Sequence, residues 1–123
     1  MTNCFCGASV SYENCCEPYI KGSKYAPTAE TLMRSRYSAF ATGAADYLVN
    51  TTHSSKRILH NKSEILAWSQ SNQWLRLEIL AVTETTVTFN AYYLDENLKE
   101  QIPYEHSTFK LENGKWFYVD GEY

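Results

Sequence analysis

The sequence contains no run of about 18 consecutive apolar residues, so we expect no membrane-spanning helix. It has no basic stretch followed by an apolar one near its start, so no signal peptide is predicted. Positive charge is also scarce. The formal net charge is −3 at pH 7, which argues against a binder of nucleic acid or of acidic membranes. These absences predict a cytoplasmic protein in a reducing compartment.

Cysteine is absent from residue 17 onward, and the four cysteines that precede it are Cys4, Cys6, Cys15 and Cys16. Adjacent Cys15 and Cys16 are poorly placed to bridge each other. Four thiolates suit a tetrahedral Zn²⁺ at about 2.3 Å, and a site closed by four protein ligands is structural rather than catalytic. We therefore predict a structural zinc ion. A redox or disulfide role and free buried thiols are the alternatives.

The remaining composition is that of an aromatic-rich globular chain. Its 123 residues fit one compact domain with a small appendage. Aromatic residues make up 15% of the chain, so we expect a core built largely from rings. The cysteine-rich segment is too short to bury a core, so metal binding should supply its folding free energy. We predict a zinc knuckle over residues 1–22 and a main domain over 23–123. Chelation is then expected to unfold the knuckle and leave the main domain folded.

Helical patterns come first in the main domain. One helix is predicted between the N-cap Thr28 and Gly43, which lies just past its end. Further helices are predicted over 44–53 and, with Ser63 as its N-cap, over 63–71. Along the first helix the apolar side chains fall on one arc, whose centre is Arg36, whereas Arg34 points away. The residues of that arc are Leu32, Met33, Tyr37 and Phe40.

Alternation with a period of two follows the helices and predicts strands. In the first strand this alternation puts Leu75 and Leu77 on one face and Trp74 on the other. In a later strand Glu105 shares a face with Phe109. The predicted strands span 73–84, 85–94, 102–111 and 116–123, with a hairpin turn at Asn113-Gly114. Helices followed by antiparallel strands predict an α+β fold, with the helices packed on one face of a curved sheet.

Several stretches together resemble a known family. The pattern C-x-C-G, eight residues and then CC resembles the SEC-C motif, the zinc knuckle seen at the tail of the SecA translocase. This knuckle, then "LMRSRYSAF", "WLRLEIL", "EHSTF" and "WFYVDG", resembles the YchJ-like family of bacterial proteins. Its members carry a SEC-C motif followed by a domain similar to nuclear transport factor 2. The resemblance implies a cone, a bent antiparallel sheet around a few helices with a pocket at its open end. The biochemical role of the family is unassigned.

Arg36 is the sharpest functional candidate in the main domain. A buried unpaired charge is costly, so its guanidinium needs a partner, and we predict an ion pair with Glu105 inside the cone. The pair could tie the helix to the sheet, Arg36 could cap a pocket and meet an anionic or carbonyl ligand, or its head could reach solvent. The candidate pocket residues are Arg36, Tyr37, His53, Trp68, Tyr92 and Glu105.

Two classes of function are open. The first is an adaptor or binding protein whose zinc knuckle contacts an unidentified protein, with the cone as scaffold or small-ligand receptor. Aromatic side chains dominate interface anchors, so the expected contact residues are Phe5, Tyr12, Pro18 and Tyr19. The second is a small enzyme of isomerase, dehydratase or hydrolase type that acts in the cone pocket. We favour the first, because a closed zinc site does no chemistry and no catalytic constellation stands out.

Two further expectations concern partners. We do not expect nucleic-acid binding, because the lysines and arginines near the knuckle form no basic stripe in the sequence. The resemblance implies that a homodimer could form, since cones of this kind often pair through the open face of the sheet.

Overall fold

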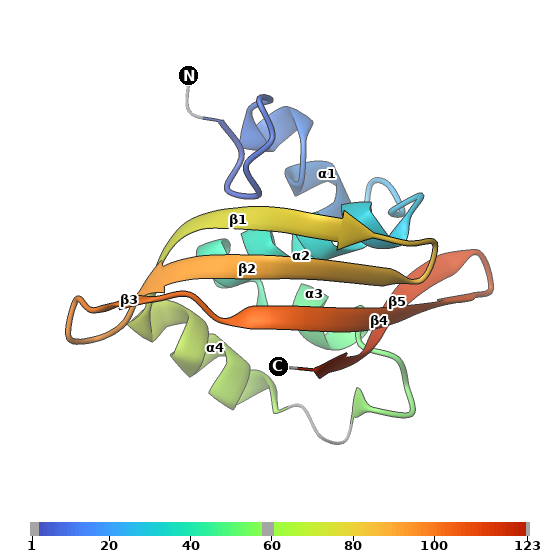
Figure 1. Ribbon diagram of the computed structural model, residues 1–123. Helices are drawn as coiled ribbons and strands as arrows, with labels where there is room; N and C mark the ends of the chain where they lie inside the picture. The colour runs from blue at the N-terminus through green and yellow to red at the C-terminus, as the bar shows by residue number, and fades with distance from the viewer. Residues whose placement is uncertain (1–2, 58–60, 123) are drawn as a thin grey trace.

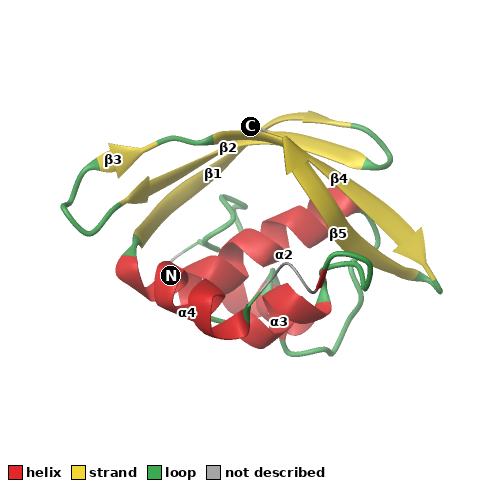
Figure 2. Ribbon diagram, turned by 90° about the horizontal axis from the view of Figure 1, so that it is seen from below, coloured by secondary structure: helices red, strands yellow, loops and turns green. Residues whose placement is uncertain are grey.

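The computed structural model describes residues 3–57 and 61–122, and it confirms an α+β fold. Three helices cover one face of a curved sheet, and the cysteine-rich segment stands beside the first strand (Figures 1 and 2). No helix of the described residues is long and apolar enough to cross a membrane. The elements are η1 (Tyr12–Asn14), α1 (Glu17–Ile20), α2 (Ala29–Thr42), α3 (Ala45–Asn50), α4 (Lys62–Ser71), β1 (Gln73–Val82), β2 (Thr86–Leu94), β3 (Glu100–Gln101), β4 (Tyr104–Glu112) and β5 (Lys115–Glu122).

Helix α2 begins and ends where the sequence predicts. The backbone of Thr28 is extended, and its hydroxyl accepts a hydrogen bond from the amide of Thr31 at 3.1 Å. This bond satisfies one of the free amides in the first turn. Gly43 ends the helix in the left-handed region, at φ 73° and ψ 26°. Both ends are therefore set by local interactions, which fixes the faces that α2 presents to the rest of the molecule.

The predictions for the two following helices need correction at their ends. Helix α3 is shorter than predicted, because it stops at Asn50 rather than near His53. Helix α4 begins two residues earlier than predicted. Its N-cap is Asn61, whose side-chain oxygen accepts from the amide of Glu64 at 3.1 Å, whereas Ser63 lies inside the helix. Asn and Ser are about equally good N-caps, so residue type alone could not choose between them.

The sheet is antiparallel, with strand order β1-β2-β4-β5 and the short β3 paired to β2. Strands β4 and β5 form the predicted hairpin. Its two central residues both have positive φ, 54° at Asn113 and 79° at Gly114, as a type I′ turn requires. The curvature of the sheet wraps it around α2 (Figure 2), so the inner faces of β2 and β4 point at that helix.

Two bulges in β1 change which of its side chains point inward. The register with β2 shifts between Trp74 and Arg76, so Leu75 is an extra residue without a partner. Trp74 therefore lies on the inner face together with Leu77, and Leu75 is 46% exposed. The predicted alternation, with Trp74 opposite Leu77, was wrong for this reason. A second shift lies between Ile79 and Ala81.

The knuckle and the cone share one apolar core. The buried cluster that holds Leu32, Met33 and Phe89 also includes Cys4, Cys6 and Cys16. The division at residue 22 stays a prediction. The packing shows that the cysteine-rich segment is laid against α2 and β1 rather than standing free.

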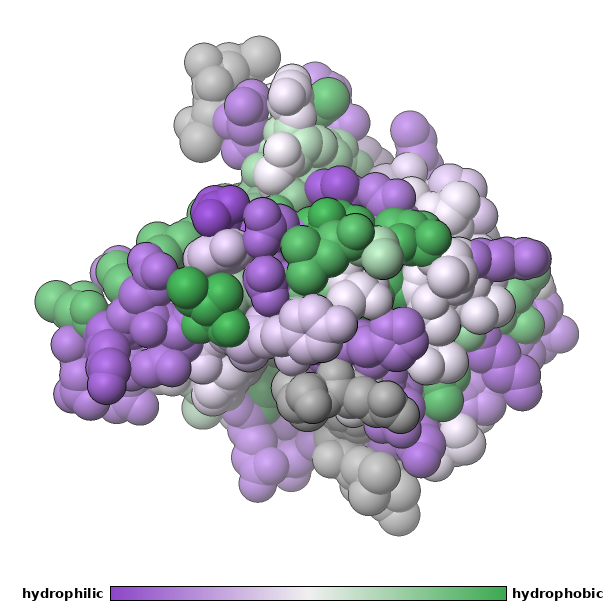
Figure 3. Space-filling view, in the orientation of Figure 1, coloured by the Kyte–Doolittle hydropathy of each residue, from purple (hydrophilic) through white to green (hydrophobic). Residues whose placement is uncertain are grey.

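The outer face of the sheet is mostly polar but carries apolar side chains over β1 (Figure 3). Leu80 of β1 and Tyr104 of β4 are 48% and 52% exposed. Elsewhere on this face Thr88 hydrogen-bonds His106 at 2.7 Å. Pairing of two chains through this face stays a prediction.

Candidate metal centre and ligand cavity

The four cysteines converge on one point. Their sulfur atoms all lie within 4.8 Å of one another, and the four residues form no disulfide. The Cys6–Cys15 and Cys15–Cys16 sulfur distances are 3.7 and 3.9 Å. For metal–sulfur bonds of about 2.3 Å, the edge of a tetrahedron is about 3.8 Å. The donor set and its spacing therefore fit a divalent ion held by four sulfurs.

The electrostatics of the cluster also call for a cation. The pKa of the Cys4 thiol is lowered, chiefly by hydrogen bonds from the Cys16 and Cys6 thiols. The pKa of Cys16 is raised by the same contact with Cys4. Burial, and then the charge of Cys6, raise the pKa of Cys15 to about 12. Four neighbouring thiolates cannot all carry charge near neutral pH unless a cation compensates them.

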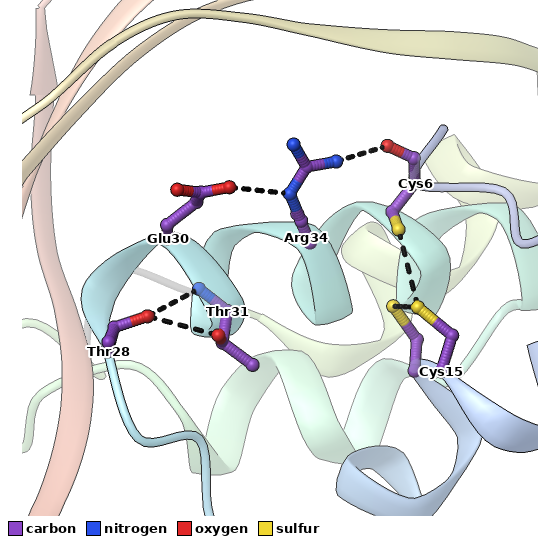
Figure 4. Close-up of polar contacts among 7 residues, drawn as sticks. Cys6, Cys15, Thr28, Glu30, Thr31 and Arg34 are labelled. Atoms are coloured by element: carbon purple, nitrogen blue, oxygen red, sulfur yellow. Dashed lines mark hydrogen bonds and ion pairs between the residues drawn. The ribbon is translucent and has the colours of Figure 1, made fainter. Parts of the chain in front are cut away.

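Helix α2 supports this cluster from the side on which Arg34 lies, which points away from the apolar arc identified in the sequence. Arg34 is half-buried. Its Nη1 donates to the carbonyl of Cys6 at 2.9 Å, and its Nε pairs with Glu30 at 2.9 Å (Figure 4). One turn further on, the buried hydroxyl of Ser38 lies 3.5 Å from the sulfur of Cys4. Gly7 lets the knuckle approach β1 closely, because a Cβ at this position would lie only 3.3 Å from the carbonyl oxygen of Leu77. The knuckle is therefore hydrogen-bonded to the cone at the candidate metal ligands themselves.

The four predicted partner-contact residues differ in exposure. Phe5 is 41% exposed, and its ring meets that of Tyr12 edge-on at 5.4 Å between centroids. Pro18 and Tyr19 lie on α1 and are half-buried. Phe5 and Tyr12 thus form one aromatic pair on the cysteine loop, whereas Tyr19 faces a separate groove beside α3.

A cavity of about 340 Å³ lies between the sheet and α2, α3 and α4. Four of the six predicted pocket residues line it, namely Arg36, Tyr37, Trp68 and Glu105. The other two do not. Its remaining walls are mainly apolar, and the side chains that the sequence analysis did not assign to the pocket are Met33, Phe40, Leu48, Ile65, Trp74, Phe89, Ala91, Tyr93, Pro103 and Tyr118.

His53 and Tyr92 were wrong as pocket residues. His53 lies beyond the C-terminus of α3, where its Nε2 meets Glu112 at 2.8 Å and its Nδ1 meets Ser55 at 2.8 Å. Tyr92 points to the outer face of the sheet, because it alternates with Ala91 and Tyr93. There it donates to Glu78 at 3.0 Å and lies beneath the guanidinium of Arg76.

One end of the cavity is a box of aromatic rings. Trp74, which the bulge turns inward, lies 5.5 Å from Phe40, 5.1 Å from Trp68 and 5.1 Å from Tyr93 between ring centroids. The indole nitrogen of Trp74 donates to the carbonyl of Ser69, which fixes the ring against α4. Trp68 is still 46% exposed, so it stands at the mouth of the cavity. This end would hold a flat apolar group.

The other end is polar and centres on Arg36, which is only 6% exposed. Its Nη1 donates to the carbonyl of Leu48 at 2.9 Å and to the hydroxyl of Thr51 at 2.7 Å. Its guanidinium lies over the ring of Tyr118, 4.5 Å from the centroid. Burial lowers the pKa of Arg36 to about 10, so the group stays charged near neutral pH.

The predicted Arg36–Glu105 ion pair is absent among the described residues. Arg36 bonds the end of α3 instead, and Glu105 accepts a short hydrogen bond from Ser107. The Glu105 carboxylate and the Tyr118 hydroxyl both lie close to Gly121. A Cβ there would lie 2.8 Å from the carboxyl carbon of Glu105 and 2.8 Å from that hydroxyl. Arg36 and Glu105 therefore share the cavity as separate polar groups. The charge of Glu105 still contributes to holding Arg36 protonated.

Comparison with known proteins shows that this chain is similar to members of one protein family. A family model described as "YchJ, middle NTF2-like domain" matches residues 28–121. The UPF0225 protein YchJ of Shigella dysenteriae serotype 1 is 40% identical over 124 residues, which cover 96% of this chain and 81% of that protein.

Solved structures agree with this match. The solution structure of a SEC-C motif containing protein from Rhodopseudomonas palustris has a TM-score of 0.90 at 34% identity, and the match covers 98% of both chains. The crystal structure of a SEC-C motif containing protein from Psychrobacter arcticus has a TM-score of 0.79 at 27% identity, covering 98% of this chain and 81% of that one. Both matches include the cysteine-rich segment as well as the cone.

Proposed function

The chain belongs to the YchJ family, and we propose that it is a zinc-stabilised binding protein whose cone receives a small ligand and whose knuckle contacts a protein partner. One observation carries the ligand-binding half. Arg36 is a buried cation on the wall of an aromatic cavity, and within residues 3–57 and 61–122 its hydrogen bonds all come from a single nitrogen, Nη1. Its other N–H groups are available to a ligand.

The cavity defines the ligand by its two ends. The rings around Trp74 would enclose a flat apolar body, and Arg36 would bind an anionic or carbonyl oxygen, because a guanidinium matches such acceptors. A volume of about 340 Å³ suits a molecule of one or two rings. The ligand class is therefore a small aryl or apolar carboxylate or ketone.

Thermal unfolding of the zinc-loaded protein with benzoate, phenylacetate and benzyl alcohol tests this half. The two acids are expected to raise Tm, and the alcohol, which lacks the anion, to act more weakly. Arg36→Met should abolish the difference between acid and alcohol, whereas Arg76→Met, on the outer face, should preserve it. If Arg36→Met does not fold, Trp68→Leu at the cavity mouth should weaken binding of the acids and the alcohol alike. Stabilisation that survives Arg36→Met would refute the proposed role of Arg36.

The knuckle half rests on the aromatic pair of the cysteine loop, in which Phe5 is exposed and Tyr12 is half-buried. A structural Zn²⁺ would hold this loop rigid and so present the pair without ordering cost on binding. The four free thiols also fit a cytoplasmic location. Affinity capture should recover a partner with the intact protein and lose it with Cys15→Ser and with Phe5→Ser. Leu98→Ser, at an exposed apolar residue in the turn before β3, should retain it. A partner that both knuckle variants keep would contradict this half.

Glu105 supports a second candidate, an enzyme that moves a proton within the cavity. Its carboxylate lies on the cavity wall beside the Tyr118 hydroxyl, a pair that could act as base and hydrogen-bond donor toward a carbonyl ligand. In D₂O, ¹H NMR should then show loss of the α-proton signal from a ketone that stabilises the protein. Glu105→Gln should stop the exchange without loss of binding. Exchange at the uncatalysed rate with wild-type protein would exclude the enzyme.

A further inference from the structure

A second hollow, a groove of about 530 Å³, lies where the knuckle meets the cone. Four separate parts of the chain form it: the end of α1 with the loop to residue 26, Leu32 of α2, helix α3 with the residues after it, and the start of β5. None of its lining residues lines the cavity described above. The groove therefore has its own chemistry and can be tested independently.

The groove gathers positive charge on an acidic protein. Among its lining residues are four of the eleven lysines and arginines of the chain, but only one of the fourteen acidic residues. The acid is Asp46, which already pairs with Lys62 at 2.7 Å. The groove thus carries a local excess of three positive charges, although the whole chain has a formal net charge of −3. Such concentration attracts anions to this one place.

Three of the four cations are without a carboxylate partner among the residues that the structure describes. Lys21 pairs with Glu17, but Lys24, Arg57 and Lys115 take part in none of the ion pairs found. Two of the three are nevertheless held in position. Arg57 donates to the carbonyls of Thr52 at 2.8 Å and Asn50 at 3.1 Å. The Lys115 ammonium lies 4.6 Å from the centroid of the Tyr25 ring. Cations that are fixed but not neutralised suit anion binding.

Aromatic side chains line the same groove. Trp116 contributes an indole ring whose nitrogen is bonded to the carbonyl of Pro27 at 3.2 Å, so its orientation is set. Tyr47 is fixed in the same way by its hydrogen bond to Ser35 at 2.7 Å. Rings of this kind stack with planar heterocycles, and neighbouring cations strengthen such contacts.

We propose that this groove binds a free nucleotide, with its phosphates on Lys24, Arg57 and Lys115 and its base against Trp116. Three unpaired cations match a diphosphate better than a single carboxylate, and fixed rings match a base. The volume lies within the range of about 300–1,000 Å³ that single small molecules occupy. This inference goes beyond the proposed function, although Tyr19, one of the predicted partner contacts, also lines the groove.

Calorimetric titration of the zinc-loaded protein with ADP, AMP and inorganic pyrophosphate at low ionic strength tests the proposal. ADP is expected to bind more tightly than either AMP or pyrophosphate, because only ADP uses both the cations and the rings. Lys115→Glu should weaken ADP binding at least tenfold. Lys99→Glu is the matched control, since it makes the same charge change at an exposed lysine outside the groove, and it should alter affinity less than twofold.

A second variant isolates the ring contact. Trp116→Leu should weaken ADP at least fivefold and leave pyrophosphate binding unchanged. If that variant does not fold, the wild-type protein gives the same information, because AMP should then bind at least fivefold more tightly than ribose 5-phosphate.

Several outcomes would overturn the proposal. The first is the absence of any heat of binding with about 1 mM ADP. The second is an affinity for pyrophosphate as high as that for ADP, and the third is an equal loss of ADP affinity in Lys99→Glu and Lys115→Glu. Tighter binding of a single-stranded oligonucleotide or of an acidic peptide than of ADP would assign the groove to a macromolecule instead. Arg36→Met should leave ADP binding intact, so failure of this inference and failure of the cavity proposal are distinguishable.

Discussion

The knuckle and the cone differ in how much regular secondary structure they contain. Residues 3–22 hold one turn of 3₁₀ helix, a four-residue helix and a single isolated bridge between Asn3 and Ser11. Three of their four cysteines are buried, and these sulfurs are the centre of the segment. The cone instead has a fourteen-residue helix packed against a five-stranded sheet. We expect a segment with so little regular structure to depend on metal binding as well as on the core that it shares with the cone, whereas the cone depends on apolar burial.

Helix α2 lies at the boundary between the knuckle and the cone and contacts the candidate site of each. Helix α2 presents Arg34 and Ser38 to the cysteine cluster and Arg36 and Tyr37 to the cavity. One helix therefore serves both sites through different faces. Loss of the metal should disturb α2 on one side before it reaches the cavity on the other. The following predictions, in order of decreasing effect, measure how far the two parts are separate.

Removal of the metal should have the largest effect. A structural zinc site contributes apparent binding free energy of about 10–16 kcal/mol, and residues 3–22 contain little regular structure of their own. With a chelator, amide hydrogen exchange should lose protection throughout this segment and partly around Arg34 and Ser38, while β2 and β4 stay protected. Added zinc should restore the pattern. Simultaneous loss of protection in the sheet would mean that knuckle and cone fold as one unit.

Phe109→Ala should have the next largest effect and act on the cone. Phe109 is 2% exposed and packs against Tyr118 at 5.9 Å between ring centroids. Truncation of a buried Phe costs about 3–5 kcal/mol, measured as the free energy of unfolding in urea. Leu111→Ala on the same strand is the control, because Leu111 is 54% exposed and should cost little. At urea concentrations below the unfolding transition, the number of zinc ions bound per chain should be the same in Phe109→Ala as in the wild type. Equal costs for the two variants would contradict the placement of the core.

Arg34→Met should have a smaller effect at the junction itself. The variant keeps the apolar stem but removes the hydrogen bond to the carbonyl of Cys6 and the half-exposed pair with Glu30. We expect a loss of about 1 kcal/mol in unfolding free energy and a severalfold weaker zinc affinity in competition with a chelator. Lys99→Met, at an exposed site away from the knuckle, should change neither. Unchanged zinc affinity in Arg34→Met would show that the cone does not support the metal centre.

Acidification should reveal the smallest effect, at the far side of the cone. The His53 hydrogen bond lowers the pKa of the Glu112 carboxyl. A carboxyl whose pKa is lower in the folded state stabilises the protein above its unfolded pKa and loses that contribution as pH falls through the folded one. Between about pH 6 and pH 3, wild-type Tm should fall by about 1–2 °C more than that of Glu112→Gln. Parallel Tm curves would exclude the contribution of this pair.

Sequence reasoning succeeded for local features and failed for distant ones. Thr28 and Asn113-Gly114 were identified because caps and tight turns involve residues within four positions of one another. The pocket position of Trp74 was missed because a bulge breaks the alternation from which strand faces are inferred. His53 was misassigned because α3 ends early and turns the following residues outward.

The amino-acid sequence by itself determined the four candidate metal ligands, the order of helices and strands, and the presence of a buried arginine on α2, since each depends on spacing along the chain. Only the tertiary structure decided what Arg36 binds and that Lys24, Arg57 and Lys115 meet in one groove. These meetings join residues far apart in the chain, and they depend on the curvature of the sheet and on the way the knuckle is seated against α2. Such geometry follows from the packing of the whole core and leaves no pattern in any short stretch of sequence.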